Sequence, residues 1–257
     1  MKILRLAVLG AALSLGGAAQ AHSPYLLPNG FDLSGRDHVT VEASFTEHPF
    51  IPDVAMKSDD FHLVDPTGAR KPLTPTYFRD LAVMEATVDG KGTWRLSSGA
   101  RAGRTAKVYR KGEDWVFLEP GKPAPDGVAL ADMQSFTTAE AYVSRGAPND
   151  AALAPTGQGL EFYALTHPNN IAVGADARFE VLLDGKPVAG QKILLTRADA
   201  DVDGGKPQEV VADAAGRFVV KVARPGVYLA MARHRIAPAD GQPGKSLTYA
   251  LTFEAVQ

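Results

Sequence analysis

Short stretches in which apolar and polar residues alternate recur along most of the chain, separated by glycine, proline, aspartate and asparagine. The clearest is 38–45, HVTVEASF, where every second residue is apolar. Such alternation puts the apolar side chains on one face of a β-strand. Turn signals follow at intervals of about 8–12 residues, a spacing typical of β-sandwiches. The pattern therefore predicts an all-β protein.

The alternation is densest in the C-terminal part of the chain. It predicts strands there over 179–183, 191–197, 209–212, 217–222, 227–233 and 247–253. Six or seven short antiparallel strands in about a hundred residues are typical of immunoglobulin-like sandwiches. We therefore predict an immunoglobulin-like or transthyretin-like sandwich for this part.

The segment 137–145 departs from the alternation and is rich in helix formers. Thr137 with Glu140 fits a capping box, and Gly146 fits a helix stop. We predict a short helix here, followed by a linker over 147–158 that is rich in Ala, Pro and Gly. Two β-sandwich units, 22–146 and 159–257, would then flank the junction.

The first 21 residues have the three parts of a secretory signal peptide. Lys2 and Arg5 form a positive start, 6–17 is an uncharged apolar stretch, and Ala19-Gln20-Ala21 is a small-x-small cleavage site. The apolar stretch is shorter than the ~20 residues that span a bilayer. We expect a mature chain that begins at His22, is periplasmic or secreted, and does not span a membrane.

The composition of the chain argues against functions that depend on cysteine and against nucleic-acid binding. The chain has no cysteine, which excludes thiolate metal sites, thiol nucleophiles and redox dithiols. Cleavage would remove Lys2 and Arg5 and leave 25 basic residues against 29 acidic ones, a formal charge of −4. No basic stripe indicates a nucleic-acid partner.

Six segments carry motifs, namely HSPYLLP at 22–28, 35–45, EHPF at 47–50, FHLVDPTG at 61–68, 157–168 and 183–190. Together they resemble the DUF4198 family, exported proteins often described as nickel- or cobalt-uptake-related periplasmic components. The resemblance implies two β-sandwich units and a role in metal handling. Glu47 departs from the family pattern, which has glycine before its second histidine, and Ala164 stands where proline is common.

His22 is the sharpest candidate for chemistry. Cleavage after Ala21 would give this residue a free α-amine beside its imidazole, and an α-amine titrates near ~7.7–8.0. The two nitrogens can close a chelate ring on a divalent ion, and nitrogen donors suit copper, nickel and zinc. Pro24 has no backbone N–H, so the third residue cannot supply a further nitrogen.

His48 is the second candidate ligand because it falls in the segment that resembles the family's G-H-x-F element. His62 is the third, since its strand could bring it across a sheet to His48, although an exposed strand residue is the plainer interpretation. Carboxylates that could complete a site are Glu47, Asp53, Asp59 and Asp60. The alternative is that His22 merely follows the cleavage site and His48 packs a loop.

No catalytic motif stands out. The chain lacks a G-x-S-x-G elbow, an H-E-x-x-H helix and a phosphate-binding glycine loop. DADVDG at 199–204 has the aspartate spacing of a calcium loop, but Val210 stands where that loop needs glutamate. We interpret the segment as an acidic hairpin loop.

The sequence thus favours a non-enzymatic, exported accessory protein. It would capture a transition-metal ion (nickel, cobalt, copper or zinc) through His22 and His48 and hand it to a membrane transporter or outer-membrane receptor. The alternative is a structural or interaction protein that docks to a membrane receptor without metal. A more distant one is a copper oxidase or monooxygenase in which His22 and His48 form a histidine brace.

Overall fold

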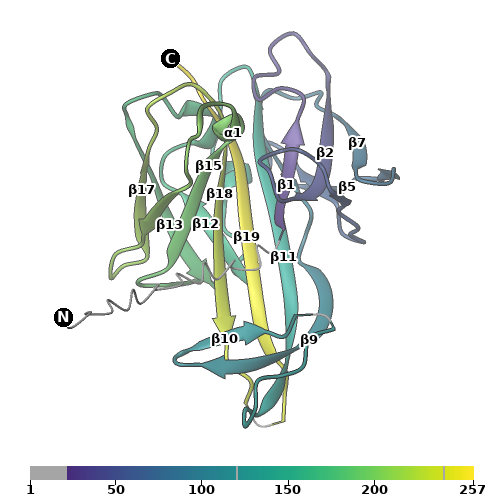
Figure 1. Ribbon diagram of the computed structural model, residues 1–257. Helices are drawn as coiled ribbons and strands as arrows, with labels where there is room; N and C mark the ends of the chain where they lie inside the picture. The colour runs from purple at the N-terminus through teal and green to yellow at the C-terminus, as the bar shows by residue number, and fades with distance from the viewer. Residues whose placement is uncertain (1–21, 120, 240) are drawn as a thin grey trace, which may run out of the picture.

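The computed structural model describes residues 22–119, 121–239 and 241–257, so the signal peptide predicted over 1–21 lies outside them. The described chain is all-β, as the alternation predicted (Figure 1). The helical pieces are one turn each: α1 (Ala200–Asp203), η1 (Ala151–Leu153) and η2 (Pro168–Asn170). Within the described residues no helix is long and apolar enough to cross a membrane.

The N-terminal strands form a five-stranded antiparallel sheet. Its strands are β1 (Ser23–Pro28), β2 (His38–Thr46), β7 (Ala82–Thr87) and β6 (Thr76–Tyr77) in that order, with β3 (Val54–Ala55) also paired to β2. β2 matches the alternating stretch 38–45, and its apolar residues Val39, Val41 and Ala43 are buried. The register pairs Ser23 with Thr46, so the start of β1 lies beside the end of β2.

A ten-stranded sheet contains strands from both halves of the chain. Its order is β16 (Gln208–Val211), β15 (Lys192–Arg197), β18 (Gly226–Ile236), β19 (Gly244–Ala255), β11 (Leu130–Arg145), β8 (Gly92–Ser97), β4 (His62–Val64) and β5 (Arg70–Pro72). β9 (Arg101–Lys111) also pairs with β11, and β10 (Asp114–Phe117) pairs with β9. β11 and β19 are parallel neighbours, from Met133 beside Gly244 to Ala141 beside Thr252.

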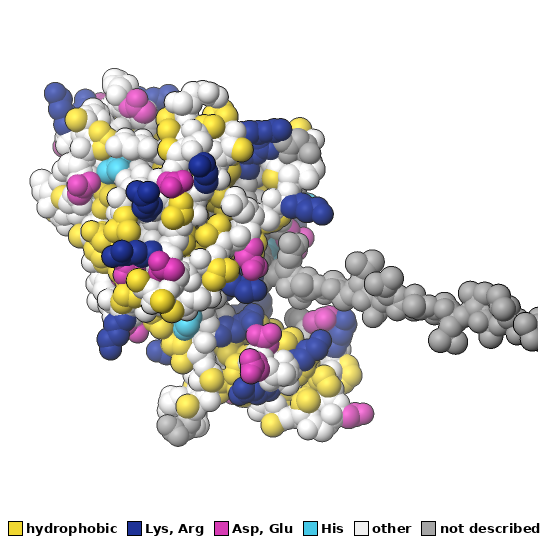
Figure 2. Space-filling model, turned by 90° about the vertical axis from the view of Figure 1, so that its left-hand side faces the viewer, with side chains coloured by type: hydrophobic (Ala, Val, Ile, Leu, Met, Phe, Trp, Pro, Cys, Tyr) yellow, Lys and Arg dark blue, Asp and Glu magenta, His cyan; other side chains and the backbone are white. Residues whose placement is uncertain are grey.

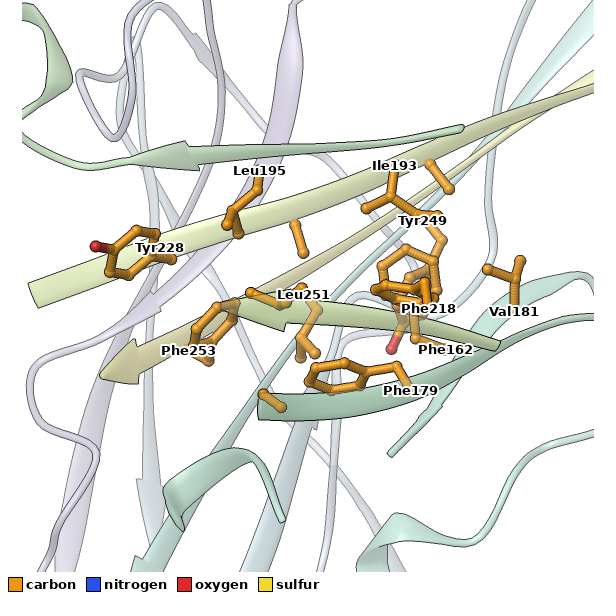
Figure 3. Close-up of a cluster of buried hydrophobic side chains, with 14 of the residues drawn as sticks. Phe162, Phe179, Val181, Ile193, Leu195, Phe218, Tyr228, Tyr249, Leu251 and Phe253 are labelled. Carbon is orange, nitrogen blue, oxygen red and sulfur yellow. The ribbon is translucent and has the colours of Figure 1, made fainter. Parts of the chain in front are cut away.

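The third sheet covers the C-terminal part of the large one. It consists of β12 (Leu160–Ala164), β13 (Asp176–Leu183), β14 (Lys186–Pro187) and β17 (Arg217–Lys221). Figure 3 shows the aromatic core between the sheets, where Phe162 lies 5.0 Å from Phe218 and 4.8 Å from Tyr249 between ring centroids. Burial of such a side chain stabilises the fold by about 1.5–3 kcal/mol.

A second core lies under the N-terminal sheet. Trp94, Met84 and Leu96 are fully buried there. C-terminal residues also belong to this core, because Leu229 and Met231 of β18 and Ala250 of β19 pack into it. β18 therefore contributes one face to each core.

The helix predicted over 137–145 is wrong, because this segment is the last part of β11. Residues 139–144 are all buried, since cores cover both faces of the sheet at this point. Ala139, Ala141 and Val143 do alternate with polar residues, but alanine and glutamate also favour helices, and this local preference led to the wrong prediction. Glu140 caps nothing; its carboxylate accepts a 2.7 Å hydrogen bond from the Tyr249 hydroxyl.

Two further segments bear on the predictions. Within the predicted linker 147–158, Ala152 and Leu153 of η1 are buried. The domain bounds themselves remain predictions.

The DADVDG segment lies between the antiparallel neighbours β15 and β16, where Gly204 ends α1 with a φ of 70°.

The hairpin of β9 and β10 extends from the body of the molecule and forms the smaller lower lobe in Figure 2. The face shown there carries acidic, basic and hydrophobic side chains interspersed, without a broad patch of one charge.

Candidate functional site

The pairing of β1 with β2 fixes the start of the predicted mature chain. All six residues of β1 have partners on β2, from Ser23 beside Thr46 to Pro28 beside Val41. His22 consequently stands opposite Glu47, and its Nε2 lies 3.4 Å from Glu47 Oε1. The His22 side chain is 41% exposed and that of Glu47 54%. His22 therefore lies directly before a paired strand, and its imidazole remains accessible.

The loop after β2 is held by its own hydrogen bonds. The Glu47 N–H donates to Asp53 Oδ2 over 2.6 Å, and the Asp53 N–H donates to the Phe45 carbonyl over 3.0 Å. The Ile51 N–H closes a turn on the His48 carbonyl over 3.0 Å. His48 therefore occupies a defined position directly after Glu47.

Glu47 was the departure from the family pattern, and the backbone accommodates it. Among the described non-glycine residues, positive φ occurs only at Phe50 (58°) and Asp184 (49°). Glu47 thus needs no left-handed backbone. The conformation that favours glycine falls three residues later, at Phe50, whose ring packs edge-on against Tyr25 at 5.2 Å.

A cleft of about 290 Å³ opens beside these residues, between the end of the N-terminal sheet and the face of β15 and β18 that is turned away from the C-terminal core. Its lining combines acidic, basic, hydroxyl and apolar side chains: Ser23, Thr46, Glu47, His48, Pro49, Leu194, Thr196, Ala200, Gly205, Pro207, Leu229, Met231 and Arg233. His48 and Glu47 share this cleft with Ser23, the residue next to His22.

Arg233 brings a positive charge to the same place. Its Nη2 donates to the His22 carbonyl oxygen over 3.3 Å. Burial, together with the nearby Arg235, lowers the pKa of the Arg233 guanidinium from its usual value, but the group remains charged at neutral pH. The cleft thus brings the Glu47 carboxylate and the His48 imidazole into the same region as the Arg233 guanidinium.

His62 has other partners. Its Nδ1 lies 2.7 Å from the Asp60 carbonyl oxygen and 3.1 Å from Arg70 Nη2, while Arg70 also binds the Asp60 carboxylate. His62 is only 8% exposed, so the plainer expectation of an exposed strand histidine is wrong. Burial lowers its imidazole pKa, which favours the neutral ring.

The carboxylates named as candidate ligands also have different partners in the structure. Glu47 faces His22, Asp53 accepts the Glu47 N–H, and Asp60 binds Arg70. In 22–119, 121–239 and 241–257, no three His, Asp or Glu side chains form a group that could hold a metal ion. Among the described residues, His22, Glu47 and His48 therefore do not form a three-ligand metal site.

The sequence reasoning did not single out Arg233. The available signal was the spacing of Leu229, Met231 and Arg233, because residues two apart share one face of a strand. Leu229 and Met231 pack into the N-terminal core, and all three residues line the cleft. His234 points to the other side, where its Nδ1 lies 3.0 Å from Gln191 Oε1.

A buried polar network elsewhere joins β8, β11 and η2. His167 Nε2 lies 2.8 Å from Thr93 Oγ1, which lies 3.0 Å from Ser144 Oγ. The Ser144 hydroxyl donates to Asn169 Oδ1 over 2.8 Å. Thr93 is fully buried and Ser144 is 4% exposed, so these hydroxyls join strands inside the molecule.

Comparisons with solved structures give distant likenesses only. A DUF4785 family protein from Legionella pneumophila is 12% identical, with a TM-score of 0.25, over 81% of this chain and 50% of that one. Trypsin-activated alpha-2-macroglobulin from Escherichia coli is 10% identical, with a TM-score of 0.23, over 90% of this chain and 15% of that one. The chain thus spans half the length of the Legionella protein, and no curated protein matches it.

A family model also matches the chain. Residues 19–236 match the model described as "Domain of unknown function (DUF4198)". This range includes His22, Glu47 and His48 and the strands that position them. The chain therefore belongs to the DUF4198 family, as its motifs predicted.

Proposed function

We propose that this protein is an exported, non-enzymatic accessory protein that captures a transition-metal ion and hands it to a membrane uptake system. One observation carries the proposal: the His22 imidazole lies 3.4 Å from the Glu47 carboxylate, and His48 follows Glu47 on the wall of the adjoining cleft. Two of the three histidines singled out from the sequence thus belong to one locality, and a paired strand holds the first of them.

The donor chemistry suits a metal that must be released. Cleavage after Ala21 would create the His22 α-amine, so that one residue offers two nitrogens. Glu47 adds a carboxylate oxygen. His48, in the adjoining loop, does not complete a three-residue group with them and would add an imidazole only if its side chain moved toward the ion. Nickel, cobalt, copper and zinc all accept such ligands. A site with open positions exchanges its ion more readily than a closed structural site, which fits transfer rather than storage.

The proposal extends to architecture and partners. We propose that 159–257 forms an immunoglobulin-like unit that docks to a membrane transporter or outer-membrane receptor, while 22–146 carries the metal. A non-enzymatic role also predicts that the copper-loaded mature chain will consume no oxygen when a reductant is supplied. Oxygen consumption that is abolished by acetylation of the His22 amine would instead favour a copper oxidase or monooxygenase.

The test uses two forms of the mature chain, one that begins at His22 and one with an additional alanine before it. Copper, nickel, cobalt and zinc are titrated into each by calorimetry. Because the extension removes the α-amine from the chelate, we expect at least a tenfold loss of affinity, about 1.4 kcal/mol. An extension after Gln257 is the matched control and should change nothing. Equal affinities, or no binding to either form, would overturn the proposal.

A further inference from the structure

A pocket of about 240 Å³ lies at the end of the C-terminal core. Strands β11, β18 and β19 supply one side of it, and the start of β12 and the end of β13 supply the other. The pocket has no lining residue in common with the cleft that contains Glu47 and His48. A ligand bound here would therefore be separate from a metal ion held beside the N-terminal sheet.

Apolar side chains make up much of the lining. Leu160 and Leu247 belong to the C-terminal core, and Leu183 packs against it. Phe136 is half-buried, and Ile236 is 39% exposed. The pocket is thus a place where the core of the sandwich reaches the surface. An apolar group that enters it would remove apolar surface from water, which is favourable.

Lys245 places a positive charge at this apolar surface. It pairs with Ile236 across β18 and β19, and its ammonium lies 6.0 Å from the centroid of the Phe136 ring. The Lys245 side chain is exposed, and no carboxylate in the described part of the chain forms an ion pair with it. This ammonium is therefore available to an anionic group of a ligand.

Asp184 also lines the pocket, but its carboxylate already has a partner. Its Oδ1 accepts the Gly159 N–H over 2.8 Å, and its own N–H donates to the Gly159 carbonyl over 2.8 Å. These two bonds join the start of β12 to the end of β13. Asp184 thus stabilises the local backbone, and its negative charge opposes the attraction that Lys245 exerts on an anion.

We propose that this pocket binds a small amphipathic carboxylate, a short or medium-chain fatty acid, with the carboxylate on Lys245 and the chain against Leu160, Leu183 and Leu247. Such an acid is ionised at neutral pH, because its carboxyl group resembles that of glutamate, with a pKa near ~4.3. The volume is below the ~300 Å³ at which sites for drug-sized ligands begin, which limits the ligand to a short chain. The inference does not depend on the proposed metal function.

Lysine suits a carboxylate at the mouth of an apolar pocket. Its ammonium is a compact charge on a flexible stem, so it can follow a head group that stays in contact with water. The methylene groups of the same stem can cover apolar surface while the charge remains solvated. Lys245 already lies in this way, with its ammonium over the Phe136 ring.

The experiment compares octanoate with 1-octanol, which has a chain of the same length and no charge. Both are titrated by calorimetry at pH 7.5 into the mature chain and into Lys245→Gln. We expect the wild type to bind octanoate about fivefold more tightly than octanol. Lys245→Gln should bind both ligands equally, with its affinity for octanol unchanged. Asp184→Asn should bind octanoate about twofold more tightly than the wild type, because a repulsive charge is gone while the amide oxygen can still accept the Gly159 N–H.

Two further variants locate the binding. Lys111→Gln is the matched control, because it removes the same charge from an exposed lysine that does not line the pocket. It should keep the wild-type preference for octanoate. Ala100→Trp adds an indole at an exposed position of the pocket lining and should weaken binding of both ligands at least tenfold. Thermal denaturation checks that each variant folds.

Three outcomes would overturn the inference. The first is no saturable binding of octanoate by the wild type. The second is binding that Ala100→Trp leaves unchanged, because the ligand would then lie elsewhere on the molecule. The third is an equal loss of octanoate affinity in Lys245→Gln and Lys111→Gln, because the effect would then come from the net charge of the protein. None of these outcomes bears on metal binding by the mature N-terminus.

Discussion

Phe50 combines an unfavourable backbone with a favourable ring contact. Its φ of 58° is the left-handed conformation, which costs a residue with a Cβ roughly 1–2 kcal/mol. Pro49 precedes it in the turn that the Ile51 N–H closes on the His48 carbonyl. The ring of Phe50 packs edge-on against the buried Tyr25, which offsets the cost.

We predict that Phe50→Ala lowers the free energy of unfolding by about 2 kcal/mol, because the ring is lost and the backbone cost remains. Phe50→Gly should be more stable than Phe50→Ala by about 1 kcal/mol, since glycine relieves that cost. Urea denaturation measures both. Ile51, whose φ is not positive, is the control position. There, Ile51→Gly should be less stable than Ile51→Ala, because glycine relieves no backbone cost at that position. The same order at both positions would contradict the prediction.

The buried His167 imidazole makes the free energy of unfolding depend on pH. Its Nδ1 accepts the Asn169 N–H over 3.1 Å, so the proton of the neutral ring is on Nε2 and donates to Thr93 Oγ1. Burial lowers the His167 pKa from its usual value. A second proton would occupy Nδ1 and break the bond from Asn169.

The direction of the pH effect follows. A lowered folded-state pKa means that the unfolded chain binds the proton more readily, so stability is full above about pH 6.5 and falls as pH drops through the folded-state value. His62 and His234 act in the same direction, since burial lowers their pKa values as well. In denaturation series from pH 7.5 to 5, His167→Gln should lose less stability than the wild type. Parallel pH profiles would refute a contribution from His167.

At the scale of strands, the sequence predicted the strands that have one exposed face and missed the strand segment that is buried on both faces. The alternation at 38–45 and 191–197 located β2 and β15 to within a residue or so. In 137–145, Ala139 and Ala141 face one core, while the other side of the strand carries Tyr142 together with the buried polar residues Glu140 and Ser144. Helix-forming residues then dominated the local signal.

The same limit applies to the candidate site. His22 and Glu47 meet through the local pairing of β1 with β2, and the sequence placed His22, Glu47 and His48 among its candidates. Arg233 reaches them only because β18 packs against the N-terminal sheet, a contact between distant parts of the chain. His62 was named on the assumption of a cross-sheet approach, whereas the structure pairs it with Asp60 and Arg70. The spacing of residues along one strand shows which side chains share a face, but it does not show which distant strand that face packs against.

A buried charge pair links the central strands. Arg95 of β8 lies with its Nε 3.9 Å from Glu140 Oε1 of β11, and their side chains are 10% and 6% exposed. The Tyr249 hydroxyl of β19 donates to the other carboxylate oxygen. Arg95 Nη1 also donates to the Ala154 carbonyl over 3.2 Å, which attaches the predicted linker to the sheet.

We predict that Glu140→Gln lowers the free energy of unfolding by about 3 kcal/mol, because it leaves the Arg95 charge buried without its counter-ion. The amide oxygen of the substituted side chain can still accept from Tyr249, so the loss reports the charge. Arg95→Met combined with Glu140→Gln should be more stable than Glu140→Gln alone, since no charge then stays buried. Chemical denaturation of the single and double variants measures the coupling. Additive losses would show that the pair does not interact.

At the scale of the whole molecule, the large sheet ties the two halves of the chain together. β11 belongs to the first half, yet its parallel neighbour is β19, the last strand of the chain. The N-terminal core also includes Leu229, Met231 and Ala250 from the second half. These long-range contacts make a single cooperative unfolding transition the expected behaviour.

A truncation tests this interdependence and the domain bounds together. The fragment 22–158 would lack β19 beside β11, and removal of Leu229, Met231 and Ala250 would open its core to water. Because an exposed strand edge and an open apolar core both favour aggregation, we expect this fragment to show no cooperative thermal transition and to leave Trp94 solvent-exposed by fluorescence. The complete mature chain, in which Trp94 is 1% exposed, is the control. A fragment that unfolds cooperatively with a buried Trp94 would show instead that the N-terminal sandwich is an autonomous domain, and that the shared sheet only joins two finished units.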